Sequence, residues 1–127
     1  MHKKFEFEYE ELDSKEALVA EDLALLNAAF QAVETAFAPY SKFKVGAAAR
    51  LSNGQIILGS NQESASYPVG ICAERTLLNS IGSQFPNESI QAMALYPKWC
   101  CVRSSIISLW DVQTIFIRFR ITLQEPY

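Results

Sequence analysis

The sequence predicts an α/β fold in which helices cover a small sheet. Three observations indicate this class: a long run with apolar positions at helical spacing, two short strand-like segments joined by an Asn-Gly turn, and a second helical segment followed by a third strand. The chain has 127 residues, which is enough for one domain with a hydrophobic core and too few for two catalytic domains. We therefore expect residues 1–127 to form a single domain with a single site.

The N-terminal third is expected to contain one long helix. Aromatic and acidic side chains alternate over residues 5–9, which predicts a short strand or an extended arm. The period of the apolar positions then changes. Asp13 or Ser14 can act as the N-cap of a helix, and Glu16 completes a capping box with Asp13. We expect one amphipathic helix of about six turns from there to Pro39. Its apolar positions are Leu18, Leu25, Leu26, Ala29, Phe30, Val33 and Phe37.

The middle of the chain is predicted to form a β-hairpin. Residues 44–51 and 55–60 have the composition of strands, and the segment between them contains the pair Asn53-Gly54. An Asn-Gly pair supplies the positive φ angles that a tight hairpin turn needs. We therefore expect the two strands to pair antiparallel.

A loop, a helix and a strand are predicted after the hairpin. Residues 61–68 are polar and are expected to form the loop. Apolar residues at helical spacing then predict a helix that begins near Cys72 and runs through Ile81. Residues 90–96 are predicted to form the third strand.

Composition and charge exclude several classes of partner. The chain carries 11 basic and 14 acidic residues, and the basic ones are scattered, so we expect no nucleic-acid polymer as a partner. No apolar run reaches the roughly 20 residues that span a bilayer, and the N-terminus leads into acidic residues, so we expect no membrane association and a cytoplasmic protein. In that reducing compartment the three cysteines, Cys72, Cys100 and Cys101, are expected to be thiols or metal ligands.

A cysteine and a carboxylate stand two residues apart at the start of the predicted second helix. Cys72 and Glu74 in this arrangement suit a hydrolytic metal site, because a thiolate holds zinc and a carboxylate that is not a ligand can move protons beside the metal. The helix N-terminus favours the negative charge. Taken alone, the pair fits a buried structural cysteine followed by a solvent-facing glutamate better.

Four separated blocks extend the pattern around this pair. They are Pro39-Tyr40-Ser41-Lys42-Phe43, Val45-Gly46-Ala47-Ala48, Asn61-Gln62-Glu63 and Cys72-Ala73-Glu74-Arg75-Thr76. In order and spacing the blocks resemble the cytidine deaminase family, and the resemblance covers about residues 1–96. It implies a three-layer α/β/α sandwich with a mixed sheet. It also implies hydrolytic deamination of cytidine or deoxycytidine to uridine or deoxyuridine, with release of ammonia and with one zinc ion (Zn2+) as cofactor.

The resemblance implies a role for each matched residue. Cys72 would be a zinc ligand, and Glu74 would be the catalytic residue that moves protons from the attacking water to the ring nitrogen and the leaving ammonia. Asn61 and Glu63 would hydrogen-bond the ribose hydroxyls, and Phe43 would pack on the pyrimidine. The implied substrate-binding residues are Phe43, Asn61, Glu63 and Ala73.

Some of these residues also have a simpler structural interpretation. Phe43 can be a core aromatic, Asn61 can cap the turn after its strand, and Arg75 can be a solvated helix residue. Glu63 is a charge in an otherwise uncharged loop, which favours a partner or a ligand over solvation alone.

A cysteine at the first ligand position resembles the short, tetrameric branch of the family. This resemblance implies a homotetramer in which neighbouring subunits help to close each pocket. It also implies that Arg75 helps to neutralise a thiolate-rich zinc site.

The resemblance stops before the C-terminal tail. In the family a Pro-Cys-x-x-Cys motif supplies the other two zinc ligands, and no such motif follows Tyr96. Cys100 and Cys101 are adjacent, so in a strand their side chains point to opposite faces. Residues 106–109 and 115–121 are instead typical of strands or of an unpaired apolar segment.

A change of reading frame would explain the missing motif. Synonymous codons for residues 108–115 exist that, read from the second base, spell Pro-Cys-Gly-Met-Cys-Arg-Gln, so we predict a frame change shortly after Ala94. A divergent tail with another use is the alternative.

Two further functions stay open. One is a catalytically inactive deaminase-fold chain that lacks these zinc ligands. The other is a relative that acts on another amino-heterocycle, against which the ribose pair Asn61 and Glu63 argues.

Overall fold

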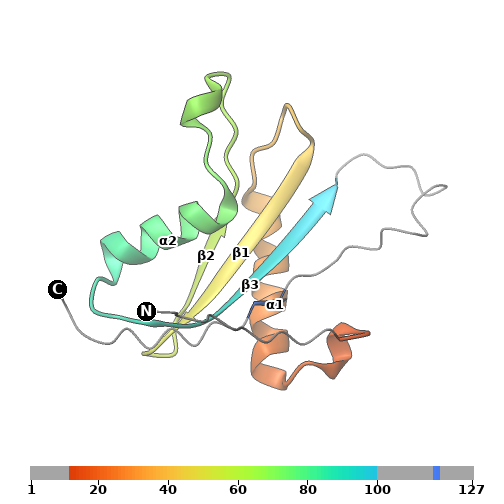
Figure 1. Cartoon of the computed structure of the whole chain (residues 1–127), viewed down its shortest axis with the longest axis vertical. Coiled ribbons are helices and arrows are strands. Elements are labelled where there is room, and N and C mark those ends of the chain that lie inside the picture. The colour runs from red at the N-terminus through yellow and green to blue at the C-terminus, as the bar shows by residue number, and fades with distance from the viewer. Residues whose placement is uncertain (1–11, 100–115, 118–127) are drawn as a thin grey trace, which may run out of the picture.

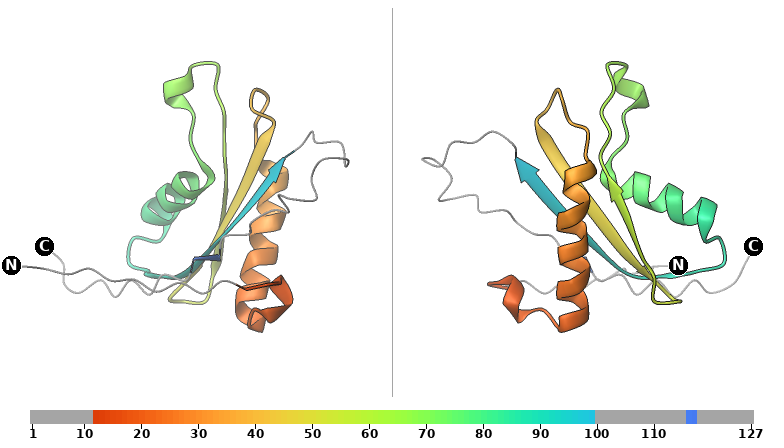
Figure 2. Two further views of the ribbon diagram at one scale, coloured as in Figure 1. Left: turned by 45° about the vertical axis from the view of Figure 1, so that its right-hand side comes forward. Right: turned by 180° about the vertical axis from the view of Figure 1, so that it is seen from behind.

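The computed structural model describes residues 12–99 and 116–117 of the chain (Figure 1). Its α-helices, strands and 3-10 helices (η) are, in order, η1 (Lys15–Ala17), α1 (Ala20–Ala32), η2 (Val33–Thr35), β1 (Phe43–Leu51), β2 (Ile56–Ser60), η3 (Tyr67–Val69), α2 (Ala73–Gln84), β3 (Ile90–Trp99) and β4 (Phe116–Ile117). Helix α1 covers one face of the sheet and α2 covers the other (Figure 2). The predicted three-layer α/β/α arrangement is therefore confirmed.

Strand β1 lies at the centre of the sheet. The strand order is β2-β1-β3-β4, and each of the three ladders between described strands is antiparallel. Helix α2 connects β2 to β3, which run in the same direction, but β1 lies between them and pairs with both. The mixed sheet that the resemblance implies is therefore not found among the described strands.

The alternation of side chains along β1 divides the core between its two faces. The core on the α1 side consists of Leu25, Leu26, Ala29, Ala48, Ala92 and Ala94. The core on the α2 side consists of Ala47, Ala49, Leu51, Ala73, Leu77 and Ile81. Successive alanines of β1 thus face opposite helices, as the period of two in a strand requires. Their small side chains allow both helices to lie close to the sheet.

Two glycines determine how closely each helix approaches the sheet. A Cβ atom at Gly46 would lie 2.0 Å from the carbonyl oxygen of Ala29 in α1. A Cβ atom at Gly59 would lie 2.7 Å from the carbonyl oxygen of Ala73 and 2.7 Å from the amide nitrogen of Leu77 in α2. Because these distances are far shorter than ordinary contacts between non-bonded atoms, only glycine fits at either position. Gly59 therefore places the first turns of α2 directly on β2.

The prediction of one six-turn N-terminal helix is wrong, because the chain is extended at Val19 before α1 begins. Ser14 is also extended, and its side chain makes no capping hydrogen bond. Val19 has φ −64° and ψ 152°. The first turn of α1 contains acidic residues, which a helix N-terminus favours. One of them, Asp22, is buried and lies 3.4 Å from the guanidinium of Arg50 in β1, so this ion pair fixes the start of the helix on the sheet.

The N-terminal helix also ends earlier than predicted. Helix α1 stops at Ala32. In the following η2, the hydroxyl of Thr35 donates a hydrogen bond of 2.9 Å to the carbonyl of Ala32. Two aromatic residues predicted for the core, Phe30 and Phe37, are 44 % and 55 % exposed. Phe30 packs edge-on against Tyr96 of β3, with ring centroids 5.0 Å apart, while Phe37 follows the end of η2.

The predicted hairpin is confirmed, with a different turn from the one expected. The carbonyl of Leu51 accepts a hydrogen bond from the N–H of Gly54, and the N–H of Leu51 donates to the carbonyl of Gln55, each at 2.9 Å. These bonds close a three-residue loop. Gly54 has φ 85°, whereas Lys42 is the only non-glycine residue in the described part of the chain with positive φ. Asn53 therefore contributes no positive φ angle.

Strand β3 confirms the predicted third strand and extends it to Trp99. Strand β4 pairs with Met93 and Ala94 and lies within the apolar stretch 115–121. The other predictions for the two ends of the chain concern residues 5–9, residues 106–109, Cys100 and Cys101, which lie outside the described residues. The frame change after Ala94 stays a prediction. Within the described ranges, no helix has the length and apolar character that a membrane span requires.

Candidate active site

The start of α2 presents the predicted cysteine and carboxylate. Cys72 is the N-cap residue, with φ −76° and ψ 162°, and its thiol is free and exposed. Its carbonyl oxygen accepts hydrogen bonds of 3.0 Å from both the N–H and the hydroxyl of Thr76. Ala73 is fully buried against the sheet, and Glu74 is half-buried in the first turn. The buried Ala73 thus anchors the start of α2 on the sheet, and the Cys72 thiol and the Glu74 carboxylate lie on either side of it in the sequence.

Gln62 joins this helix start to the loop that follows β2. The N–H of Gln62 donates to the carbonyl of Ile71, and the N–H of Ile71 donates to the carbonyl of Gln62, each at 2.9 Å. The side-chain amide of Gln62 also donates to the carbonyl of Thr35 at 3.0 Å. Gln62 therefore brings Ile71, the residue before Cys72, next to the segment that contains Asn61 and Glu63. Sequence reasoning did not single out Gln62, although its place between those two residues marks it.

Asn61 holds the first residues of β1 with its side chain. Its Oδ1 accepts the N–H of Val45 at 2.8 Å, and its Nδ2 donates to the carbonyl of Phe43 at 2.9 Å. Its backbone N–H donates to the carbonyl of Val45 at 3.2 Å. The interpretation of Asn61 as a residue that caps the end of its strand is therefore compatible with the structure. Its assignment to ribose binding stays a prediction.

Glu63 binds the loop before β1. Its Oε2 accepts hydrogen bonds from the N–H groups of Tyr40 at 2.9 Å and Ser41 at 3.2 Å, and its Oε1 accepts one from the Ser41 hydroxyl. The Ser41 hydroxyl is the largest of the causes that hold the pKa of Glu63 below its usual value of 4.5. The two N–H groups and the positive charge of Lys42 act in the same direction. Glu63 thus has partners within the chain, as its isolated charge indicated.

Phe43 lies between these two residues at the start of β1. It is half-buried, and its N–H donates a hydrogen bond of 3.1 Å to the hydroxyl of Ser41. Its carbonyl is the acceptor for Asn61. The structure therefore brings Phe43, Asn61 and Glu63 together through backbone and side-chain hydrogen bonds. Ser41 is the second residue of this group that sequence reasoning did not single out.

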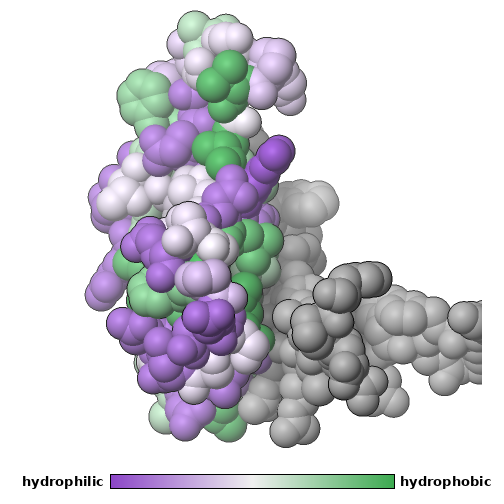
Figure 3. All heavy atoms as spheres, turned by 90° about the vertical axis from the view of Figure 1, so that its left-hand side faces the viewer, coloured by the Kyte–Doolittle hydropathy of each residue, from purple (hydrophilic) through white to green (hydrophobic). Residues whose placement is uncertain are grey.

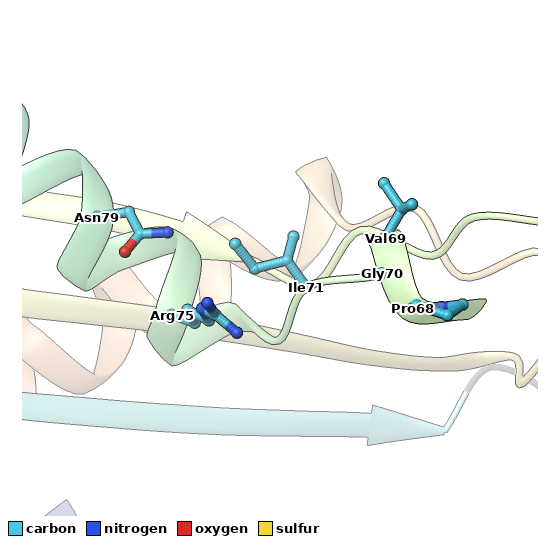
Figure 4. A pocket seen from close by; sticks show the side chains of 6 residues that line it. All are labelled: Pro68, Val69, Gly70, Ile71, Arg75 and Asn79. Atoms are coloured by element: carbon cyan, nitrogen blue, oxygen red, sulfur yellow. The ribbon is translucent and has the colours of Figure 1, made fainter. Parts of the chain in front are cut away.

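A separate hollow lies on the outer side of the α2 start (Figure 4). It has a volume of about 190 Å³ and is lined by Pro68, Val69, Gly70, Ile71, Arg75 and Asn79. Neither Cys72 nor Glu74 lines it, so we do not identify this hollow with the candidate active site. Arg75 is exposed beside it, and its predicted effect on a zinc site stays a prediction.

The described residues supply only part of a zinc site. An exposed cysteine at a helix N-terminus with a nearby carboxylate matches the donor chemistry of one ligand and one proton carrier. Among residues 12–99 and 116–117, no group of three His, Cys, Asp or Glu side chains is arranged to hold a metal ion. The described residues by themselves therefore do not complete a metal centre.

Comparison with protein families identifies the chain. A family model described as the cytidine and deoxycytidylate deaminase zinc-binding region matches residues 19–116, a range that includes every residue of the candidate site. The chain belongs to this family. Membership in the cytidine and deoxycytidylate deaminase family confirms the resemblance carried by the four sequence blocks, and it implies zinc as the metal. The assignment of Cys72 as a zinc ligand stays a prediction.

This chain aligns with only part of each of its relatives in the family. A cytidine deaminase of Halalkalibacterium halodurans is 52 % identical over 54 residues, which are 42 % of this chain and 41 % of that protein. A cytidine deaminase of Mycobacterium tuberculosis is 42 % identical over 55 residues, which are 43 % of this chain and 41 % of that protein. The chain therefore spans about two-fifths of the length of these relatives.

Solved structures support the same fold. The crystal structure of cytidine deaminase from Mycobacterium tuberculosis superimposes with a TM-score of 0.55 at 35 % identity, over 58 % of this chain and 59 % of that one. The cytidine deaminase from Burkholderia pseudomallei gives a TM-score of 0.53 at 45 % identity, over 57 % of each chain. The shared part is the α/β core of a cytidine deaminase.

Proposed function

We propose that this chain carries the nucleoside-binding and proton-transfer part of a zinc-dependent deaminase, which converts cytidine or deoxycytidine to uridine or deoxyuridine and releases ammonia. One observation carries the proposal: Cys72 and Glu74 lie at the N-terminus of α2, and the Gln62–Ile71 hydrogen bonds join that helix start to the segment of Asn61 and Glu63. The reaction belongs to pyrimidine salvage.

Glu74 is the proposed proton carrier. When bound, zinc supplies Lewis-acid activation of the attacking water, and Cys72 is the described residue that would hold it. Glu74 is half-buried in the first turn of α2 and is two residues from that thiol. A carboxylate in this position can take a proton from the attacking water and deliver protons to the ring nitrogen and the leaving amine.

Ala73 is proposed to act through its backbone. The first N–H groups of an α-helix have no acceptor within the helix, and Ala73 is the first residue of α2. The whole residue is buried, and its methyl group packs in the core on the α2 side, so a ligand that reaches this helix start can be bound only through the backbone N–H. A pyrimidine carbonyl that reaches the helix start can accept such an N–H.

Asn61 and Glu63 retain hydrogen-bonding capacity for ribose. A carboxylate has about four lone-pair sites, and three hydrogen bonds from Tyr40 and Ser41 use three of them at Glu63. The side-chain amide of Asn61 makes one bond through each of its polar atoms, and each atom can make one more. Each residue is therefore proposed to bind one ribose hydroxyl, while Phe43 packs on the base.

The assembly is proposed to be a cytoplasmic homotetramer without a nucleic-acid polymer as partner. The loop between Asn61 and Cys72 projects beyond the sheet (Figure 1), and at its tip Tyr67 is 91 % and Val69 70 % exposed. Hydrophobic surface reaches this loop in the space-filling view of the α2 side (Figure 3). A projecting apolar tip is the kind of feature that a neighbouring subunit covers. The acidic net charge of −3 disfavours binding to phosphate backbones.

The function is tested on two proteins, the 127-residue chain and a version in which the reading frame is changed after Ala94. Both share residues 1–94 and are incubated with cytidine while uridine and ammonia are measured. Release of ammonia from cytidine by the frame-restored protein, in equal amount to uridine, supports the proposal. A frame-restored protein that folds and contains zinc but neither binds nor converts cytidine or deoxycytidine contradicts it.

A further inference from the structure

The loop between Ala38 and β1 is shaped by one serine. Lys42 closes the loop with φ 59° and donates its N–H to the carbonyl of Ala38 at 3.1 Å. Immediately before it, Ser41 uses its hydroxyl twice: it donates to Oε1 of Glu63 and accepts the N–H of Phe43 at 3.1 Å. A single hydroxyl therefore connects two of the residues assigned to nucleoside binding.

The Glu63 carboxylate is fixed through both of its oxygens. The Ser41 hydroxyl binds Oε1, while the N–H groups of Tyr40 and Ser41 bind Oε2. A carboxylate held in this way cannot rotate without losing hydrogen bonds. The lone pair left for a ligand then points in a defined direction.

Phe43 is fixed from both sides of its backbone. Its N–H is bound by Ser41, and its carbonyl is bound by the side-chain amide of Asn61. The start of β1, from which the aromatic ring projects, is therefore held in part by Ser41, which also binds Glu63.

We propose that Ser41 is a positioning residue for nucleoside binding, because its hydroxyl holds the Glu63 carboxylate and the Phe43 backbone in one fixed arrangement. The inference rests on the proposed function. Alanine at this position has neither the donor nor the acceptor, whereas threonine retains both. Loss of the hydroxyl removes the group that binds both Glu63 and Phe43, while the N–H groups of Tyr40 and Ser41 still hold Oε2 of Glu63 and Asn61 still holds the Phe43 carbonyl. Ribose and base are then no longer held by a directly connected pair.

The protonation of Glu63 gives a readout that needs neither zinc nor turnover. The Ser41 hydroxyl is the largest cause of the lowered pKa of Glu63, ahead of the N–H groups of Tyr40 and Ser41 and the charge of Lys42. Ser41→Ala is therefore expected to raise the pKa of Glu63 toward its usual value of 4.5. Ser41→Thr is expected to keep it low.

Ser64 offers a matched control. Its hydroxyl accepts the N–H of Ser66 at 3.2 Å, which is the same spacing of two residues as between Ser41 and Phe43. Ser64→Ala therefore removes an equivalent serine–backbone hydrogen bond from a different loop. It tests whether any lost hydroxyl in this region has the same effect.

The experiment combines two measurements on each variant. The pKa of Glu63 is measured by NMR titration of the 127-residue chain, and cytidine affinity, KM and kcat are measured on the frame-restored protein. We expect Ser41→Ala to raise the pKa of Glu63 and to weaken cytidine binding about tenfold at unchanged kcat, since one hydrogen bond to a charged group is lost. Ser41→Thr restores both properties, and Ser64→Ala changes neither.

Three outcomes overturn the inference. An unchanged pKa of Glu63 in Ser41→Ala means that the hydroxyl does not hold the carboxylate. A raised pKa with unchanged cytidine affinity, while Glu63→Ala weakens affinity, means that the position of the carboxylate does not depend on Ser41. If the frame-restored parent binds no nucleoside, the proposed function fails and the inference fails with it, even where the pKa of Glu63 responds.

Discussion

Gln62 and Ile71 exchange two backbone hydrogen bonds of 2.9 Å, which close the neck of the loop between β2 and α2. The ends of this loop are thereby fixed next to each other, with Asn61 on one side and Cys72 on the other. The tip of the loop takes no part in these two hydrogen bonds. Tyr67 at the tip is 91 % exposed.

The closed neck predicts that the tip and the core respond differently to substitution. Tyr67→Ser is expected to change the free energy of unfolding by less than about 0.5 kcal/mol, as is usual for an exposed residue, and to weaken self-association. Leu77→Ala, at a fully buried position of α2, is expected to cost about 2–5 kcal/mol. Urea unfolding and sedimentation equilibrium measure the two effects. A Tyr67→Ser variant with an unchanged oligomeric state removes the support for a subunit contact at this tip.

The glycines under the helices predict a second contrast. Gly59→Ala and Gly46→Ala each bring a methyl group into the backbone of a helix, and each is expected to destabilise the protein by about 1–3 kcal/mol or more. Gly82 also lies in α2, but a Cβ atom there would meet nothing beyond its own helix within 4 Å. Gly82→Ala is therefore expected to stabilise the protein by about 0.5–1 kcal/mol.

The two destabilising variants are expected to differ at the candidate site. Gly59 lies under Ala73, the residue that stands between Cys72 and Glu74 in the sequence, whereas Gly46 lies under α1. The rate at which the Cys72 thiol reacts with an alkylating reagent should therefore change in Gly59→Ala and not in Gly46→Ala. Equal rates in both variants, under conditions where both are folded, contradict this role of Gly59.

Acidification is predicted to loosen the loop before β1. The folded-state pKa of Glu63 is lowered, mainly by the Ser41 hydroxyl, so its contribution to stability is present above the usual value of 4.5 and is lost as the pH falls below it through the lowered value. The amide chemical shifts of Tyr40 and Ser41, whose N–H groups bind the carboxylate, are expected to follow this titration. In Glu63→Gln the same shifts should not titrate in this range. Titration that persists in this variant assigns the effect to another group.

Local patterns predicted the hairpin and the start of α2, because their signals lie within a few residues. Gly54 permits the turn, and Cys72 precedes a run with helical spacing. The break at Val19 was not predicted, since apolar spacing alone cannot distinguish one long helix from an extended segment followed by a shorter helix. The start of α1 depends partly on the pairing of Asp22 with Arg50, which are distant in sequence.

The resemblance named the residues of the candidate site, but not the contacts between them. The resemblance singled out Asn61 and Glu63, but the partners of Glu63 are 22 and 23 residues away in the chain. Such contacts exist only because the pairing of β1 with β2 places the segment after β2 beside the loop before β1. Ser41 and Gln62 lie within the blocks that carry the resemblance, but only the folded chain shows that they connect the other residues.

Glu74 is predicted to be required for turnover and not for metal binding. In the frame-restored protein, Glu74→Gln is expected to keep zinc and to lose nearly all turnover, because an amide cannot carry the proton that general acid–base catalysis requires. Glu34→Gln is the matched control, since Glu34 is exposed and lies 3.7 Å from Lys98 in a surface pair that contributes little. Zinc content and ammonia release are measured together. Activity of Glu74→Gln within tenfold of the parent contradicts the role assigned to Glu74.

The last prediction concerns zinc in the 127-residue chain itself. Catalytic zinc normally takes three protein ligands and leaves the fourth position to water. Within the described ranges, Cys72 is the one cysteine, and no group of three potential ligands is arranged around it. We therefore expect the chain to hold well under one zinc ion per molecule and to show no measurable deamination of cytidine.

Changing the frame after Ala94 is expected to restore both properties, because the alternative frame supplies the two cysteines of the Pro-Cys-x-x-Cys motif. The restored ligands would also connect the start of α2 to a second segment, so the melting temperature should rise when zinc is added and fall when it is chelated. Metal analysis beside an ammonia-release assay decides the matter. Stoichiometric zinc together with turnover in the unchanged chain would mean that Cys100, Cys101 or another group completes the site, and the predicted frame change would then be wrong.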